Sequence, residues 1–296
     1  MTLTNSFKTP EGEAAYLEAY EAAMKLWTVP YEEIEVPGQF GITHVVVSGP
    51  QDAPPLVLLH GFFGTLAMWS PNIADFSHDY RVYAIDIMGH PSKSIPGEPV
   101  RDAADLATWL SATLDGLNLD RFALVGLSYG GWLALYFAMT EPERVQKLAL
   151  LSPAASFQAP GGQFNLRGLL MGIFPTRFAL NSFFGWLGYN TNPDDAVDQH
   201  VLELVYLGLK HFRFPPDTRP IVPNVFSDDQ LSALSMPMLL LIGENEVMYD
   251  AAEVMARARR LIPNFEGEVV PHCNHEMSFS QYPIVDARVV DFLKNN

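Results

Sequence analysis

Short apolar runs alternate with longer amphipathic stretches through most of the chain. The runs carry almost no charge and have the length of strands that are buried on both faces, as in parallel sheets. They are Leu56–Leu59, Val82–Ile87, Phe122–Val125, Leu148–Leu151 and Met238–Ile242. Two stretches between them, Asp102–Leu117 and Gly130–Met139, suit crossover helices. This alternation predicts an α/β fold with a largely parallel sheet.

Further elements are expected at both ends of this pattern. Glu11 to Trp27 contains few helix breakers and predicts an N-terminal helix. Glu32–Val36 and Ile42–Val47 are rich in β-branched residues and flank Pro37-Gly38, which predicts a hairpin. Ile284–Lys294 predicts a closing helix.

The alternation stops after the fourth apolar run. The segment that follows is rich in Phe, Gly, Pro, Trp and Leu and predicts short helices broken at Pro175, Pro193 and Pro215-Pro216. A structureless loop of this length is rare in a compact domain, so we interpret the segment as a helical cap over the sheet. We therefore expect a helical extension over residues 1–30, a core over 31–155 and 236–296, and a cap over 156–235.

Gly126-Leu127-Ser128-Tyr129-Gly130 is a G-x-S-x-G sequence between a predicted strand and a predicted helix. A strand-to-helix turn this sharp strains the serine backbone and needs glycines at the flanking positions, where a Cβ would strike the neighbouring chain. The hydroxyl then stands clear of the sheet at a helix N-terminus. Ser128 is therefore the candidate nucleophile.

His60-Gly61-Phe62-Phe63-Gly64 follows the first apolar run. Acyl transfer needs two backbone N–H donors aimed at the oxygen that becomes an oxyanion. Tyr129, next to the nucleophile, can supply one, and Phe62 is the candidate for the other. We interpret His60 as a residue that orders the turn.

A serine hydroxyl needs a base within hydrogen-bonding reach. His275 follows the last predicted strand, Glu266–Val270, and is the candidate base, with His272 as the alternative. Cys273 between them raises the possibility of a metal site, but a lone H-C-x-H cluster lacks the partners that zinc requires.

The third residue should be an acid that leaves a strand between the nucleophile and the base. Glu246 is the preferred candidate, with Asp250 second and Glu244 third. The end of the preceding strand, Leu151–Ala155, offers no carboxylate.

Charge and cysteine content narrow the possible partners. The 296 residues include 34 Asp plus Glu against 18 Lys plus Arg, a formal net charge of −16. Such a surface repels phosphate backbones and anionic headgroups, so no binding to nucleic acid or membrane is expected. The single cysteine fits a reducing compartment. The N-terminus lacks a basic start followed by an apolar core, so we expect a cytoplasmic protein.

The assembled residues resemble the α/β-hydrolase superfamily from about Ile42 to the end. The shared pieces are His60-Gly61 with Gly64, Asp86-Ile87-Met88-Gly89-His90, Gly126-x-Ser128-x-Gly130-Gly131, Gly243-x-x-Glu246 and His275. More narrowly, the chain is similar to the bacterial carboxylesterases of the carboxylesterase NP type, in stretches such as Asp52–Gly61, Pro71–Asp75 and Glu246–Asp250. The resemblance implies the α/β-hydrolase fold with an eight-stranded sheet and a helical cap, ester hydrolysis and no cofactor.

Two departures from the superfamily pattern are present. Most members have Asp where this chain has Glu246. The common G-H-G-x-S after the Asp86 strand is replaced by Gly89-His90-Pro91-Ser92-Lys93-Ser94, which alters a loop.

These residues predict hydrolysis of small-molecule carboxylic esters by a Ser-His-Glu triad through an acyl-enzyme. Aromatic residues of the cap suggest a pocket for an apolar or aromatic group: Phe157, Phe164, Phe174, Phe178, Phe183, Phe184, Trp186 and Tyr189. Three alternatives stay open: hydrolysis of a carbon–carbon bond in a vinylogous diketone, a cofactor-free perhydrolase, and a ligand-binding protein with feeble turnover.

Overall fold

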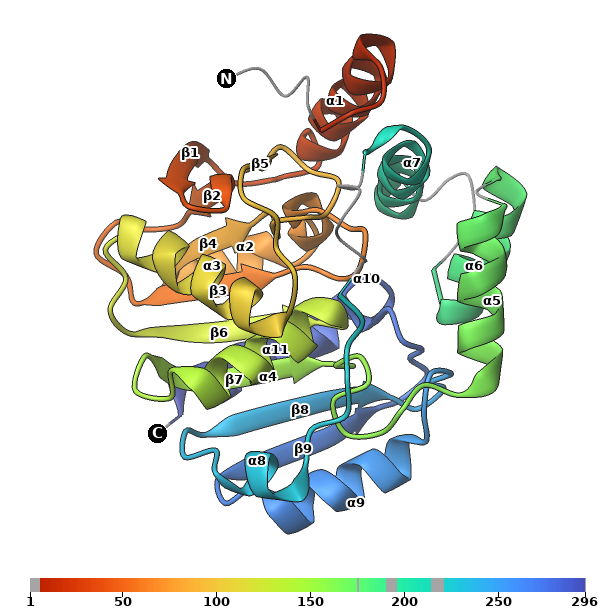
Figure 1. Cartoon of the computed structure of the whole chain (residues 1–296). Coiled ribbons are helices and arrows are strands. Elements are labelled where there is room, and N and C mark those ends of the chain that lie inside the picture. Colours follow the sequence, from red (N-terminus) through yellow and green to blue (C-terminus); the bar gives the residue numbers. More distant parts are fainter. Residues whose placement is uncertain (1–5, 175, 190–195, 214–220, 296) are drawn as a thin grey trace.

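The strands form one nine-stranded sheet in the order β1-β2-β4-β3-β6-β7-β8-β9, with short β5 beside β2 (Figure 1). The computed structural model describes residues 6–174, 176–189, 196–213 and 221–295. The strands are β1 (Tyr31–Gly38), β2 (Gly41–Ser48), β3 (Pro55–Leu59), β4 (Arg81–Ile85), β5 (Ile95–Pro96), β6 (Phe122–Leu127), β7 (Val145–Leu151), β8 (Met238–Gly243) and β9 (Phe265–Val270). The helices are α1 (Pro10–Met24), the 3-10 helix η2 (Leu66–Trp69), α2 (Ile73–Asp79), α3 (Ala103–Gly116), α4 (Tyr129–Thr140), α5 (Gly162–Ile173), α6 (Arg177–Leu187), α7 (Ala196–His211), α8 (Asp228–Ser232), α9 (Ala251–Leu261), α10 (Met277–Ser280) and α11 (Tyr282–Lys294).

The sheet is parallel in its centre and antiparallel at one side. Each neighbouring pair from β4 through β3, β6, β7 and β8 to β9 is parallel. Strand β2 pairs in the antiparallel sense with β1, β4 and β5. The predicted α/β class with a mostly parallel sheet is therefore confirmed, and short β5 adds a ninth strand to the expected eight.

Helices cover both faces of the sheet, and each face has its own apolar core. Alternate residues of β3 point to opposite faces: Leu56 and Leu58 belong to one cluster, Val57 and Leu59 to the other. Helices α2 and α11 contribute to the first cluster, and α3, α4 and α9 to the second. Strands that are buried on both faces carry no polar side, which explains their uninterrupted apolar runs.

The expected strands and crossover helices agree with the structure to within a few residues. The strand that begins near Val82 is shorter than expected, because β4 ends at Ile85. The backbone oxygen of the next residue, Asp86, accepts a hydrogen bond from the Ser94 hydroxyl in the following loop. Helix α9 is missing from the sequence-based prediction because most of its residues are polar or small. Its buried stripe consists of Val254, Met255 and Ala258 alone.

The segment between β7 and β8 contains α5, α6, α7 and α8. Helices α5 and α6 lie to one side of the sheet, and α7 lies next to α1 (Figure 1). The predicted helix breaks at Pro175, Pro193 and Pro215-Pro216 lie outside the described residues. Within the described ranges, no helix is both long and apolar enough to cross a membrane.

Candidate active site

The site lies where the carboxyl ends of the central strands meet. Strand β3 pairs with β6 so that Leu59 is opposite Gly126, which brings the loop after β3 beside the turn after β6. A Cβ built on Gly61 would lie 3.8 Å from the Cβ of Ser128. In open parallel sheets this edge is where ligands bind.

The turn between β6 and α4 holds Ser128 in a strained conformation, with φ 50° and ψ −110°. Its flanking glycines are required by close contacts with backbone. A Cβ on Gly126 would lie 2.3 Å from the carbonyl oxygen of Gly130, and one on Gly130 would lie 2.2 Å from that of Leu59. The Ser128 N–H donates to the Leu151 oxygen at 2.9 Å, so the end of β7 anchors the turn. The backbone strain is thus concentrated at the residue that carries the candidate nucleophilic hydroxyl, as expected for a functional residue.

Ser128, His275 and Glu246 form a hydrogen-bonded row. The Ser128 Oγ lies 2.9 Å from Nε2 of His275, and the Nδ1 of His275 lies 2.8 Å from Oε2 of Glu246. All three side chains are buried. The second oxygen of Glu246 accepts the N–H groups of Val247 and Met248 at 2.8 and 2.9 Å, which fixes the carboxylate. The structure thus brings together the three residues preferred from the sequence.

The other acids and the other histidine lie elsewhere. Asp250 caps the N-terminus of α9, where its side chain accepts two backbone N–H groups. Glu244 accepts the backbone N–H of His272 at 2.8 Å, and the His272 side chain is 90% exposed. Burial raises the pKa of the Cys273 thiol to about 11. No group of three or more His, Cys, Asp or Glu among the described residues could hold a metal ion.

The loop that carries His275 is held from two directions. The N–H of Asn245 donates to the Cys273 oxygen at 2.8 Å, and Gly243 lets the loop approach β8, since a Cβ there would lie 2.3 Å from the Asn274 oxygen. From the other side, the N–H of His275 donates to the carbonyl oxygen of Leu187, at the end of α6, at 3.1 Å. The position of the imidazole thus depends on the segment between β7 and β8.

The protonation states of the row follow from burial and pairing. Burial lowers the pKa of His275, but the Glu246 carboxylate more than offsets it, and the pKa is raised above its ordinary value. Burial raises the pKa of Glu246, but the imidazole and the Met248 N–H offset this and the pKa is lowered. Glu246 is therefore ionised and orients the Nδ1–H, which leaves Nε2 free to accept the serine proton.

Phe62 and Tyr129 lie side by side next to Ser128, with ring centroids 5.3 Å apart. Tyr129 is the first residue of α4, so its N–H has no acceptor within the helix. No hydrogen bond of either N–H to another described residue is present. Both amides are therefore free to bind an oxygen at this place.

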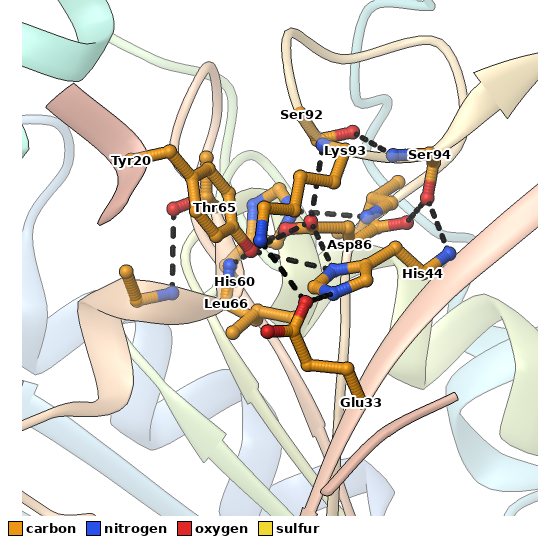
Figure 2. Close-up of polar contacts among 12 residues, drawn as sticks. Tyr20, Glu33, His44, His60, Thr65, Leu66, Asp86, Ser92, Lys93 and Ser94 are labelled. Carbon is orange, nitrogen blue, oxygen red and sulfur yellow. Dashed lines mark hydrogen bonds and ion pairs between the residues drawn. The ribbon is translucent and has the colours of Figure 1, made fainter. Parts of the chain in front are cut away.

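A buried polar network joins the loop after β3 to neighbouring segments of the chain (Figure 2). Its centre is Asp86: Oδ1 accepts the Leu66 N–H at 2.9 Å, and Oδ2 lies 2.8 Å from the Tyr20 hydroxyl and 2.9 Å from Nδ1 of His44. Burial raises the pKa of Asp86, but His44 more than offsets it, and the pKa is lowered. The ionised carboxylate thus ties the start of η2 to β2 and α1.

His60 contacts backbone groups of this network. Its Nε2 accepts the N–H of Ile87 at 2.9 Å, and its Nδ1 lies 2.8 Å from the Gly61 oxygen. Burial lowers its pKa, so the ring stays neutral with the proton on Nδ1. These contacts join the loop after β3 to the loop after β4, in agreement with a role in ordering the turn.

The loop that departs from the superfamily pattern keeps its attachment to Asp86. The N–H of Lys93 donates to Oδ2 at 3.3 Å, and the Ser94 hydroxyl donates to the backbone oxygen of Asp86 at 2.8 Å. The changed residues therefore alter the loop without releasing it.

A model of the α/β-hydrolase fold family matches residues 54–282. The chain belongs to this family. An uncharacterized carboxylesterase named nap from Bacillus subtilis is 37% identical over 287 residues, covering 94% of this chain and 91% of that protein. Carboxylesterase YbfK from the same organism is 35% identical, covering 97% and 96%. The crystal structure of naproxen esterase (carboxylesterase NP) from B. subtilis has a TM-score of 0.90 at 34% identity and covers 97% of this chain and 100% of that one.

A cavity of about 510 Å³ opens above Ser128 in this α/β-hydrolase. Its walls come from the loop after β3 and from helices α5, α6 and α7. The residues that line it are mostly apolar or aromatic: Phe62, Phe63, Phe164, Met171, Phe183, Phe184, Leu187, Tyr189, Leu209 and Met248, with Ser128, His275 and Glu276. Such walls suit an apolar ligand.

Half of the aromatic residues predicted for the pocket line it. These are Phe164, Phe183, Phe184 and Tyr189. Phe157 lies in the core beneath, and Phe174 and Phe178 are exposed to solvent. Trp186 lies under the guanidinium group of Arg167, 5.1 Å from the ring centroid.

Several parts of the site were not predicted, among them the apolar wall residues Phe63, Met171, Leu209 and Met248. Leu187 contributes through its backbone oxygen, which no sequence pattern reveals. Glu276 was missed because an acidic residue in a loop normally has a solvated side chain. In the structure it lines the cavity, directly after His275.

Proposed function

We propose that the chain is a serine carboxylesterase in which Ser128 is the nucleophile, His275 the base and Glu246 the acid. The observation that carries the proposal is the hydrogen-bonded row from Ser128 through His275 to Glu246 at the floor of an apolar cavity. Similarity to carboxylesterases over nearly the whole chain supports it. The reaction as proposed needs neither a cofactor nor a metal.

In the first half-reaction, Nε2 of His275 takes the proton from Ser128 as Oγ attacks the ester carbonyl carbon. The imidazolium that forms is stabilised by Glu246, which also keeps Nε2 directed at the serine. The imidazolium then gives its proton to the leaving alcohol oxygen, and the acyl group stays on Ser128.

In the second half-reaction, water attacks the acyl-enzyme and gives its proton to His275. The carboxylic acid leaves, and the proton returns to Ser128. In both halves the oxyanion accepts the N–H groups of Phe62 and Tyr129. Removing one such donor typically costs about 2.7–4 kcal/mol of barrier.

Residues 156–235 are proposed to form a cap that sets substrate choice, above a core of residues 31–155 and 236–296 and beside the extension of residues 1–30. Helices α5, α6 and α7 of this segment supply most of the cavity's apolar wall. An ester with an apolar or aromatic body would bury that body against the aromatic rings. The single buried thiol, Cys273, supports a cytoplasmic location.

A fluorophosphonate probe with mass mapping, together with a panel of p-nitrophenyl esters, tests the proposal. We expect a single modified residue, Ser128, and rates that rise from acetate to medium-length acyl groups and to an aryl ester. A label on another residue, or no label, would contradict the assignment. Faster turnover of a vinylogous diketone, or of acetate with peroxide to peracid, would favour the alternative activities.

The pH dependence of kcat/KM should show an acid limb controlled by His275. The base acts only when neutral, so activity is expected to fall as pH drops through its raised pKa. Glu246 is the main cause of the rise. Its replacement by Gln should therefore move the residual activity's acid limb to lower pH. Profiles measured with one ester for both enzymes would check this, and an unmoved limb would contradict the pairing.

A further inference from the structure

Glu276 directly follows His275 and is one of the residues that line the same cavity as Ser128. The residue is 4% exposed. Most of the wall around it is apolar or aromatic, so a carboxyl group contributes little to packing there. A carboxylate that is taken out of water without a partner is destabilising, so its presence calls for a compensating interaction.

One of the two carboxyl oxygens, Oε2, has no hydrogen-bond partner among the described residues. The Tyr189 side chain forms a hydrogen bond with this carboxyl group. Buried polar atoms in native proteins are nearly always satisfied. The terminal bond of a glutamate side chain is a soft torsion, so a small rotation can present either oxygen to a ligand in the cavity.

The surroundings of Glu276 are acidic. Asp198 on α7 and Glu246 carry carboxylates that act on Glu276, while His275 is the facing group that can carry positive charge. Within the described parts of the chain, neither Lys nor Arg lines the cavity. A cationic group would be attracted to this place, and an anionic one would be repelled.

We propose that Glu276 forms a subsite for a hydrogen-bond-donating group of the substrate, with a protonated amine bound more tightly than a hydroxyl and a carboxylate excluded. The inference rests on the proposed esterase function and narrows its substrates. They are esters with a largely apolar body and one basic group a few atoms from the ester bond, because adjacent residues such as His275 and Glu276 have Cα atoms about 3.8 Å apart.

The acid strength of Glu276 agrees with this role. Burial is the main cause that raises its pKa to about 7, and Asp198 and Glu246 add to the rise, while His275 and Tyr189 act in the opposite direction. The subsite therefore becomes anionic as pH rises through neutrality. Preference for a cationic substrate should increase over the same range.

The test compares two pairs of esters with the full chain. The first pair is the p-nitrophenyl esters of 4-(dimethylamino)butyrate and of its isostere 5-methylhexanoate. In the second pair, the dimethylamino group and its alkyl isostere are carried by the alcohol part of the ester instead of the acyl part. The protonated tertiary amine donates one hydrogen bond, whereas its free base can attack the ester of its own molecule, so the rate without enzyme is subtracted for each ester and pH. At pH 8, the amine-to-alkyl ratio of kcat/KM, for whichever pair responds, should be roughly 10- to 100-fold higher in the wild type than in Glu276→Gln.

Glu143→Gln is the matched control, since it changes net charge equally at an exposed site that does not line the cavity. Its ratio should equal that of the wild type. Equal ratios in the wild type and Glu276→Gln, with the alkyl esters still cleaved by Ser128, would overturn the subsite and leave the esterase proposal standing. Absence of ester cleavage in the wild type would overturn both.

A measurement on the wild type alone covers the case in which Glu276→Gln does not fold. Between pH 6 and 8 the amine-to-alkyl ratio should rise, and titration of His275 cancels because it acts on both esters. The p-nitrophenyl monoester of glutarate should react more slowly than the alkyl ester, increasingly so as pH rises. A ratio that is constant over this range would contradict the proposal.

Discussion

Replacing Ser128 with alanine is expected to lower kcat for p-nitrophenyl ester hydrolysis by roughly 10⁵- to 10⁶-fold. The substitution removes the atom that forms the acyl-enzyme. His275 loses its 2.9 Å partner, but the cavity and the two oxyanion donors remain. The residual rate should therefore still exceed that in buffer. Steady-state rates with purified protein, and loss of the fluorophosphonate label, would check this.

A matched control separates this effect from a general effect of losing a hydroxyl. Ser235 is exposed and lies just before β8, so Ser235→Ala should retain wild-type kcat and KM. Circular dichroism should show both variants folded. Turnover by Ser128→Ala within a few fold of the wild type would eliminate the proposed mechanism.

Replacing Glu246 with glutamine is expected to lower kcat by roughly 10⁴-fold. An amide cannot stabilise the imidazolium, and its NH₂ group favours the tautomer in which Nδ1 accepts and Nε2 carries the proton. That tautomer cannot take the proton of Ser128. The effect should be larger on kcat than on KM, because the carboxylate lies behind the imidazole and away from the cavity wall.

Asp250→Asn is the control for the choice of acid. Asp250 caps α9, and asparagine caps nearly as well, so activity should stay near that of the wild type. If Asp250→Asn lost activity and Glu246→Gln kept it, the acid would have to be reassigned. Loss in Glu246→Gln alone would support the row seen in the structure.

Much of the fold and the row of three residues could be predicted because strong local signals coincide. A strand buried on both faces has no polar side, so β3 or β8 is visible as an apolar run without knowledge of its neighbours. The strained turn at Ser128 allows only glycine at two flanking positions, which leaves a pattern in the sequence. The base and the acid could then be chosen by their positions along the chain, with the acid after a strand between the nucleophile and the base and the base after the last strand.

Other features depend on tertiary contacts and leave no such pattern. Helix α9 buries a narrow stripe among polar residues, so periodicity is weak. In the segment between β7 and β8, Phe178 is 85% exposed while Phe183 is 7% exposed, although their sequence surroundings are alike. Both lie on α6, and the side of the helix that faces the cavity and α5 carries Phe183. Glu276 faces the cavity for the same kind of reason.

The hydrogen bond from the His275 N–H to the Leu187 oxygen has a consequence for how such enzymes diversify. Gly188, next in sequence, lies so close to Asn274 that a Cβ there would approach the asparagine Cβ to 2.3 Å. The end of α6 and the loop that carries His275 are therefore packed so closely that a shift of one would displace the other. Grafting a foreign insert to gain new substrates would disturb proton transfer unless the graft junction preserved this pair, whereas exchanges confined to α5 would leave turnover chemistry intact.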